Sequence, residues 1–142
     1  MPTFVQQALA SRPITVFAGG GQTRAFLSVV DLARFFCDYF DDALQSDNRI
    51  YNLGNPDNAT SILDLARRVK ELAHSDSPIV LADAKTIHGP DYEEAESIDK
   101  LPLVGAAAEI GWEPRVGLDT LITQTIDYYR ACPDMRGAHA PL

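Results

Sequence analysis

Cysteine is scarce in this sequence. Only Cys37 and Cys132 occur among the 142 residues, and they lie far apart. This number and spacing give neither a disulfide framework nor the paired ligands of a structural zinc site, so no metal site is expected. Cys37 ends the apolar run Phe35-Phe36-Cys37, which predicts a buried structural thiol rather than a reactive one.

Positive charge is also in short supply. Twelve Lys and Arg residues against twenty Asp and Glu residues give a formal net charge of -8, and the basic residues are scattered. No partnership with nucleic acid or with an anionic membrane surface is expected, because both require a local positive potential. A small phosphate-bearing ligand is still compatible with this charge, since one or two well-placed arginines and a few backbone N–H groups suffice.

Long apolar runs and a leader segment are missing as well. No run approaches the roughly 20 residues that span a bilayer, and no signal pattern opens the chain, which predicts a cytoplasmic protein. The hydrophobic content of 46% is enough for one core. We therefore expect one domain over residues 1–132, followed by a flexible tail over residues 133–142.

What the sequence does contain is a clear helical periodicity in several stretches. Apolar spacing predicts helices over 3–9, 29–44, 61–73, 106–110 and 118–130, and Ser61 with Asp64 resembles a capping box. Residues that favour β-structure predict strands over 14–17, 49–53 and 78–82, whereas 83–103 resembles a long loop. The expected fold class is α/β: a small mixed domain of about five helices and a few short strands.

One glycine turn is a candidate ligand site. Gly19 to Gly21 follow the first predicted strand, close to Gln22 and Arg24. Glycines let the backbone approach a ligand, and the guanidinium of Arg24 offers several donors to a phosphate. The alternative is a tight turn with a solvated arginine, which the glycines alone favour. The turn is neither the dinucleotide fingerprint nor a Walker motif, so no cradle for NAD or ATP is predicted here.

Other polar residues give weaker signals. Asn52, Asn55 and Asn58 surround the next turn, and we expect Asn55 and Asn58 to bond their own backbone. His88 and Tyr92 lie in the acidic loop and are candidates for a general acid or for ligand contacts. No serine or cysteine stands in a nucleophile motif, so no catalytic residue is predicted from the pattern.

Several motifs together resemble one known family. They are Pro13-Ile14-Thr15-Val16-Phe17, the glycines with Gln22-Thr23-Arg24-Ala25-Phe26, Tyr51-Asn52-Leu53-Gly54-Asn55-Pro56 and Gly111-Trp112-Glu113-Pro114-Arg115. The pattern is similar to the carboxy-terminal, substrate-binding part of extended short-chain dehydrogenases and extends over most of the chain. It is most similar to UDP-glucuronic acid decarboxylases, and less so to dTDP-glucose dehydratases and UDP-sugar epimerases.

The resemblance implies a site for a UDP- or dTDP-linked sugar. The residues that it assigns to substrate binding are Thr15, Phe17, Gly20, Gln22, Arg24 and Tyr92. It also implies that NAD is held by the other, Rossmann half of the complete enzymes, with a glycine fingerprint and a Tyr-x-x-x-Lys pair. This sequence has neither motif. An ungapped alignment on Tyr92 places Ile98 where the decarboxylases carry a proton-donating arginine, so no catalytic residue and no cofactor are expected in this chain.

Three interpretations are open at this point. The chain is a nucleotide-sugar-binding domain or fragment that works beside a separate cofactor-binding half or self-associates. Alternatively, it is an enzyme of another class that reuses the pocket without NAD, or a degenerate product that keeps only the fold. We favour the first because the glycine turn and Arg24 are present while the catalytic residues are missing. It predicts uncovered apolar side chains where the other half would pack.

Overall fold

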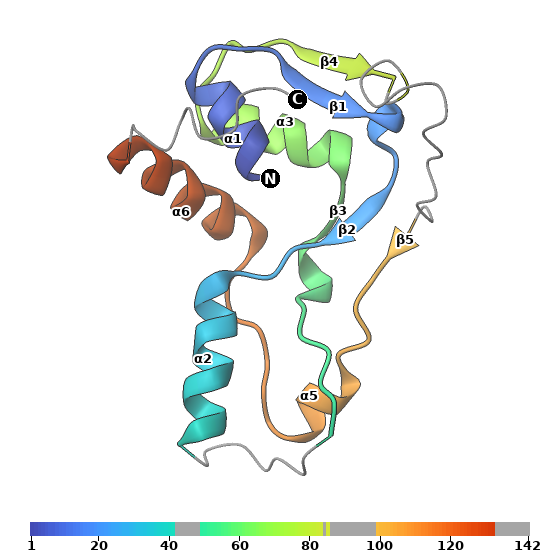
Figure 1. The fold of residues 1–142 in the computed structure, drawn as a ribbon, viewed down its shortest axis with the longest axis vertical. Coiled ribbons are helices and arrows are strands. Elements are labelled where there is room, and N and C mark those ends of the chain that lie inside the picture. The colour runs from blue at the N-terminus through green and yellow to red at the C-terminus, as the bar shows by residue number, and fades with distance from the viewer. Residues whose placement is uncertain (42–48, 84, 86–98, 133–142) are drawn as a thin grey trace.

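The computed structural model describes residues 1–41, 49–83, 85 and 99–132. Five α-helices and five short strands are found in these residues, together with two 3-10 helices, η1 and η2 (Figure 1). This small mixed α/β arrangement confirms the expected fold class. The elements are, in chain order, α1 (Pro2–Leu9), β1 (Ile14–Phe17), η1 (Ala18–Gly20), β2 (Thr23–Ala25), α2 (Val29–Phe40), η2 (Pro56–Asn58), β3 (Ala59–Ser61), α3 (Ile62–Leu72), β4 (Ile79–Ala82), β5 (Asp99–Lys100), α5 (Gly105–Glu109) and α6 (Leu118–Ala131).

The strands form two small sheets. β1 pairs in parallel with β4, in a register that runs from Ile14 opposite Ile79 to Phe17 opposite Ala82. β2 is the middle strand of the second sheet, antiparallel to β3 and parallel to β5. The chain passes from the first sheet to the second through the glycine turn.

The main hydrophobic core lies under the β1–β4 sheet. Helices α1, α3 and α6 pack against each other there, and α1 and α3 also contact β1 (Figure 1). Arg68 on α3 also reaches α6, where its Nε donates to Asp119 Oδ1 over 2.6 Å. The buried residues of this core are Val5, Ala8, Ile14, Val16, Leu65, Ala66, Val69, Ala73, Ile122 and Ile126.

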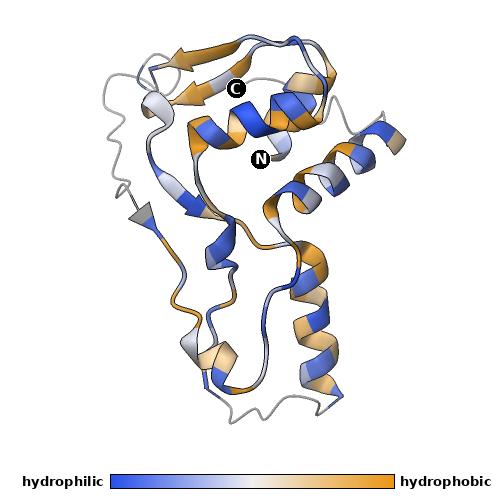
Figure 2. Cartoon of the chain, turned by 180° about the vertical axis from the view of Figure 1, so that it is seen from behind, coloured by the Kyte–Doolittle hydropathy of each residue, from blue (hydrophilic) through white to orange (hydrophobic). Residues whose placement is uncertain are grey.

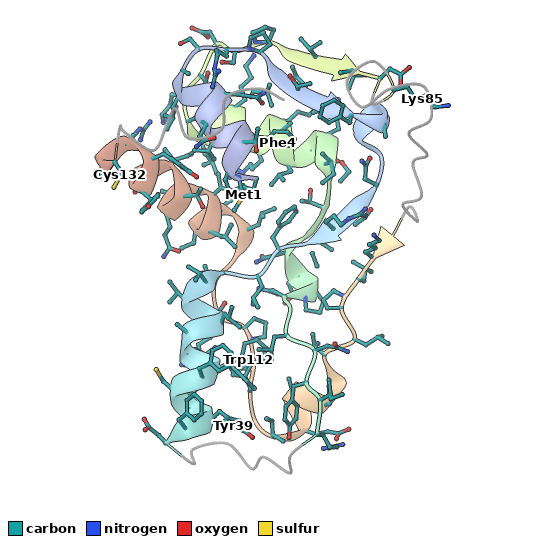
Figure 3. All side chains as sticks on the ribbon, in the orientation of Figure 1. Met1, Phe4, Tyr39, Lys85, Trp112 and Cys132 are labelled. Atoms are coloured by element: carbon teal, nitrogen blue, oxygen red, sulfur yellow. The ribbon has the colours of Figure 1, made fainter. Side chains whose placement is uncertain are left out.

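A second, smaller apolar cluster lies between α2 and α5. Phe35 of α2 packs edge-on against Trp112, with ring centroids 5.7 Å apart and an interplanar angle of 90°. Figure 3 shows the Trp112 side chain beside α2. Ala107 and Ile110 complete the buried part of this cluster.

A set of buried polar contacts fixes the chain that leads into α6. The carboxylate of Asp31 accepts the backbone N–H groups of Arg115 and Val116, over 3.0 and 2.9 Å. The carbonyl oxygen of Val116 accepts the side-chain amides of Asn55 and Asn58, over 3.1 and 2.9 Å. These contacts join α2, η2 and the 113–117 segment, and we call them the Val116 clamp.

The asparagine contacts match the expectation only in part. Asn55 Oδ1 accepts the N–H of Asp57 over 3.1 Å, which is the predicted local turn bond. The amide of Asn58 instead reaches the distant carbonyls of Phe26 and Val116. Both asparagines are buried, so both support the fold.

Several sequence expectations need correction. The predicted strand over 49–53 joins neither sheet of the described chain, whereas the unpredicted strands β2, β3 and β5 form a sheet. Helix α2 ends at Phe40, not at residue 44, with a turn at Asp41. The prediction of a buried Cys37 is wrong: its thiol is exposed, because α2 turns Phe35 and Asp31 toward the interior.

Candidate functional site

The glycine turn packs closely on its neighbours. Gly20 is buried with a φ of +71°, and a Cβ there would lie 2.6 Å from Val16 Cγ1 and 2.9 Å from Leu63 Cβ. Gly19 also has a positive φ, but it is exposed. The fold alone therefore requires glycine at position 20, and a ligand contact at Gly20 stays a prediction.

The next residues connect this turn to the start of α3. The carbonyl oxygen of Gln22 accepts the N–H of Ile62 over 3.1 Å, and the Gln22 residue is half-buried. Ser61 caps α3: its hydroxyl accepts the N–H of Asp64 over 3.0 Å and donates to the Asp64 carboxylate over 2.7 Å. Ser61 is thus the N-cap that the sequence predicts, while the Asp64 carboxylate bonds the Ser61 hydroxyl rather than the Ser61 backbone N–H of a full capping box.

Arg24 lies in the middle of the second sheet. Its register partners are Thr60 on β3 and Lys100 on β5. Directly paired residues in neighbouring strands project from the same face of a sheet, so the three side chains form one row, which we call the Arg24 row. Arg24 is half-buried and Lys100 is exposed. One donor of the guanidinium, Nη1, bonds the carbonyl oxygen of Thr23 over 2.7 Å.

The Arg24 row suits an anionic ligand. A guanidinium and an ammonium on adjacent strands bring two positive charges close together on a chain that is acidic as a whole. Arginine also makes directional, charge-assisted bonds to phosphate oxygens, and lysine adds a second point charge. A phosphate or diphosphate group is the ligand that this chemistry favours.

Thr15 and Phe17 project from the side of β1 that faces away from the main core. Ile14 and Val16 alternate with them and are buried. Thr15 is bonded to α1: its N–H donates to Gln7 Oε1 over 3.2 Å, and its hydroxyl accepts Gln7 Nε2 over 3.5 Å. Thr15 is thus part of the contact between α1 and β1. Gly20, Gln22 and Arg24 follow one another along the chain from the glycine turn into β2.

Two predicted positions cannot be placed. Tyr92, and with it His88, lies outside the described residues. In contrast, Thr60 and Lys100 enter the candidate site only through the structure. Each is distant in sequence from Arg24, and no motif marks either residue, so only strand pairing brings them together.

The described chain also has a surface depression that is separate from the Arg24 row. A shallow depression lies at the carboxy-terminal end of α3, and it contains none of the predicted residues. No His, Cys, Asp and Glu cluster suitable for a metal is found among the described residues. No helix in the described ranges combines the length and the apolar character that membrane crossing requires. The residues that line the depression are Arg67, Lys70, Glu71, His74, Ser75, Asp76 and Ile79.

Comparison with known proteins gives both sequence and fold relatives. The chain is 32% identical over 126 residues to UDP-glucuronic acid decarboxylase 1 of Danio rerio, a match that covers 89% of this chain and 28% of the relative. Its fold is similar to UDP-glucose 4-epimerase of Thermotoga maritima, solved with UDP-glucose, with a TM-score of 0.75 and 22% identity over 92% of this chain and 38% of that one. It is also similar to UDP-glucuronic acid 4-epimerase of Bacillus cereus, solved with UDP-glucuronic acid and NAD, with a TM-score of 0.74 and 19% identity over 92% and 39% of the two chains. No protein-family model matches the chain.

The chain therefore has the fold of one part of these epimerases, and its sequence is homologous to one part of the decarboxylase. It belongs to the extended short-chain dehydrogenase family as a partial member, homologous to UDP-glucuronic acid decarboxylases. It spans less than a third of the length of the decarboxylase that it matches. The family resemblance seen in the sequence is thus confirmed.

Proposed function

We propose that this chain is a nucleotide-sugar-binding domain that recognises the diphosphate of a UDP- or dTDP-linked sugar. In this proposal it is not a complete catalyst alone and acts with a cofactor-binding half outside this sequence. The observation that carries the proposal is the Arg24 row, in which Arg24 lies between Thr60 and Lys100 on one face of a sheet. The homologous decarboxylases and the similar epimerases act on UDP sugars by their names, which supports this ligand class.

Among the described residues, the glycine turn does not fit the pyrophosphate of NAD. In the dinucleotide fold a glycine-rich turn opens directly into a helix, whose N-terminal N–H groups hold the pyrophosphate. Here the glycine turn is followed by strand β2, and the buried Gly20 packs on Val16 and Leu63. We therefore derive no step of a reaction through NAD on this chain.

Substitution of Arg24 tests the proposal. Charge-assisted hydrogen bonds contribute roughly 1.5 to 3 kcal/mol, so Arg24→Ala is expected to weaken UDP binding about ten- to a hundredfold. Arg24→Lys is expected to recover only part of the loss, because an ammonium cannot form paired bonds to a phosphate. Titration calorimetry, supported by ligand-observed NMR with a panel of nucleotide sugars, measures the affinities.

The matched control is Arg67→Ala. Arg67 is an exposed arginine on α3 whose Nη1 bonds Asp64 Oδ1 over 2.8 Å, so its removal changes the net charge equally without touching the Arg24 row. UDP affinity is expected to stay within about twofold of wild type, since exposed ion pairs contribute little. Equal UDP affinities for wild type and Arg24→Ala would overturn the site assignment.

A further inference from the structure

Strand β4 has one edge that no strand covers within the described chain. It pairs in parallel with β1 alone and lies at the top of the molecule in Figure 1. The N–H of Ile14 on β1 donates to the carbonyl oxygen of Pro78 over 2.8 Å. Alternate residues of a strand bond to the same side, so the N–H and C=O groups of Ile79 and Leu81 point to the open edge.

The opposite edge of this sheet is covered. The N–H of Thr15 on β1 points away from β4 and donates to Oε1 of Gln7 on α1 over 3.2 Å. Helix α1 also packs against β1. A two-stranded sheet is only marginally stable and gains from further strands. The open edge of β4 is therefore the side on which this sheet can grow.

The open edge strand is apolar. Natural edge strands are commonly protected from pairing by a charged residue or a proline, and β4, with the sequence Ile79-Val80-Leu81-Ala82, has neither within its bounds. It is hydrophobic along its length (Figure 2, uppermost arrow). Leu81 is the register partner of the buried Val16, so it lies on the core face of the sheet, yet it is 59% exposed. The core layer thus ends uncovered at this edge.

The surface depression at the end of α3 continues this core face beyond β4. Ile79 lines the depression and also packs against the main core. The other lining residues come from the carboxy-terminal end of α3 and its connection to β4, and they include charges of both signs, such as Lys70 and Asp76. A strand placed beside β4 would extend the sheet over this depression and direct its core-face side chains toward α3.

A second copy of β4 fits this edge in its hydrogen bonding. Antiparallel pairing about a two-fold axis at Val80 places Ile79 opposite the partner's Leu81. The outward N–H and C=O groups of these two residues then bond each other, twice over by symmetry. The apolar side chains of Ile79 and Leu81 from both copies also meet on the core face, which covers the exposed end of the core.

The charges around the strand fit a second copy as well. In this register Asp83 lies opposite the partner's Ser77, so no like charges face each other. The chain that precedes β4, with Asp76, runs beside the chain that follows β4 in the partner, with Lys85. Each chain carries a net charge of -8. Added salt is therefore expected to strengthen the association, because it screens the long-range repulsion.

We infer that β4 pairs with β4 of a second copy of this chain, which gives a four-stranded sheet in the order β1-β4-β4-β1. The inference does not depend on the proposed nucleotide-sugar site, because that site lies on the other sheet. Each strand contributes only four residues. A contact of this size is expected to form a weak dimer whose population depends on concentration.

Sedimentation equilibrium of the full chain, from micromolar to millimolar concentration, measures this association, and amide hydrogen exchange locates it. A monomer–dimer equilibrium is expected. The amides of Ile79 and Leu81 are expected to become about tenfold more protected when about a tenth of the chain remains monomeric, since they exchange from the monomer. The amide of Val80 points to β1 and is expected to change less.

Two variants of Leu81 test the pairing. Leu81→Lys is expected to weaken the dimer at least about tenfold, because a lysine on an edge strand opposes pairing. Leu81→Pro removes the outward N–H but leaves the bonds to β1, and it is expected to abolish the dimer. Thermal unfolding checks that each variant is folded.

Val29→Lys is the matched control. Val29 is 76% exposed on α2, so this change adds the same charge at another exposed apolar position, and dimerisation is expected to stay within about twofold of wild type. A chain that stays monomeric at millimolar concentration would overturn the inference. So would a dimer that Val29→Lys abolishes and Leu81→Lys keeps, or a dimer in which the Ile79 and Leu81 amides gain no protection. Exchange is measured on the wild type, so it tests the edge even where a Leu81 variant does not fold.

Discussion

Asp31 is the buried charge on which the middle of the molecule depends. Its carboxylate accepts two backbone N–H groups of the Val116 clamp and a bond from Arg34 Nη2 at 3.2 Å. Burial raises the pKa of Asp31, but the hydrogen bonds from Val116 and Arg115 and the contact with Arg34 together hold this pKa below its ordinary value. The ionised form is therefore the one that the fold stabilises.

A pH dependence of stability follows from this shift. A lowered folded pKa gives stabilisation that is complete above the unfolded pKa of about 3.9 and is lost as the pH falls through the folded pKa. Asp31→Asn leaves one clamp N–H without a good acceptor and is expected to lower the free energy of unfolding by roughly 1 to 3 kcal/mol at pH 7. Urea unfolding followed from pH 7 down to below the unfolded pKa measures both effects.

The comparison for this prediction is Asp38→Asn. Asp38 lies on the same helix but forms a longer, more exposed contact with Arg34, at 3.6 Å. It is expected to cost under about 1 kcal/mol. If Asp31→Asn kept both the stability and the acid sensitivity of wild type, the clamp would not have the importance assigned to it.

At the level of elements, the amino terminus of α3 joins the turn to the core. The Ser61 cap satisfies the N–H of Asp64, and Ile62 donates to the carbonyl of Gln22. Ser61→Ala is expected to destabilise the chain by about 1 kcal/mol, because one helix N–H group loses its acceptor. Thermal unfolding measures the loss, and Ser61→Asp, which restores an acceptor, is expected to recover most of it. A Ser61→Asp variant as unstable as Ser61→Ala would contradict the capping role.

The elements also show how far the sequence could predict the fold. Apolar periodicity located the five helices, and β-favouring runs located β1 and β4, because these features are local. The short strands β2, β3 and β5 were missed, since their pairing joins segments that are distant in sequence. The 49–53 segment shows the converse: it has the residues of a strand, but a ladder needs a partner that the described chain does not supply.

The candidate site, like the fold, was predictable from local sequence features only in part. Gln22 and Arg24 could be chosen from the sequence because they follow a recognisable glycine turn. Lys100 could not, because its place beside Arg24 depends on a strand of only two residues. Cys37 was assigned to the interior because an apolar run does not reveal which side of a helix packs. Local chemistry was thus predictable, whereas neighbours across the fold were not.

At the scale of the whole molecule, the two apolar clusters are covered by neighbouring elements to different extents. The core under the β1–β4 sheet is enclosed by three helices, while α2, which buries Phe35 in the second cluster, leaves Val29 and Phe40 exposed. The Val116 clamp fixes one cluster relative to the other through buried hydrogen bonds. The two clusters and the sheet that carries the Arg24 row are thus held together by these polar contacts.

The same organisation predicts how the chain behaves toward NAD. In the described part of the chain the glycine turn leads into β2, so no helix N-terminus presents its N–H groups to a pyrophosphate there. Titration calorimetry with NAD is therefore expected to give no saturable binding to the isolated chain, whereas UDP gives a signal in the same preparation. Micromolar or tighter NAD binding by the isolated chain would contradict this prediction, because it would require a cofactor site within this sequence.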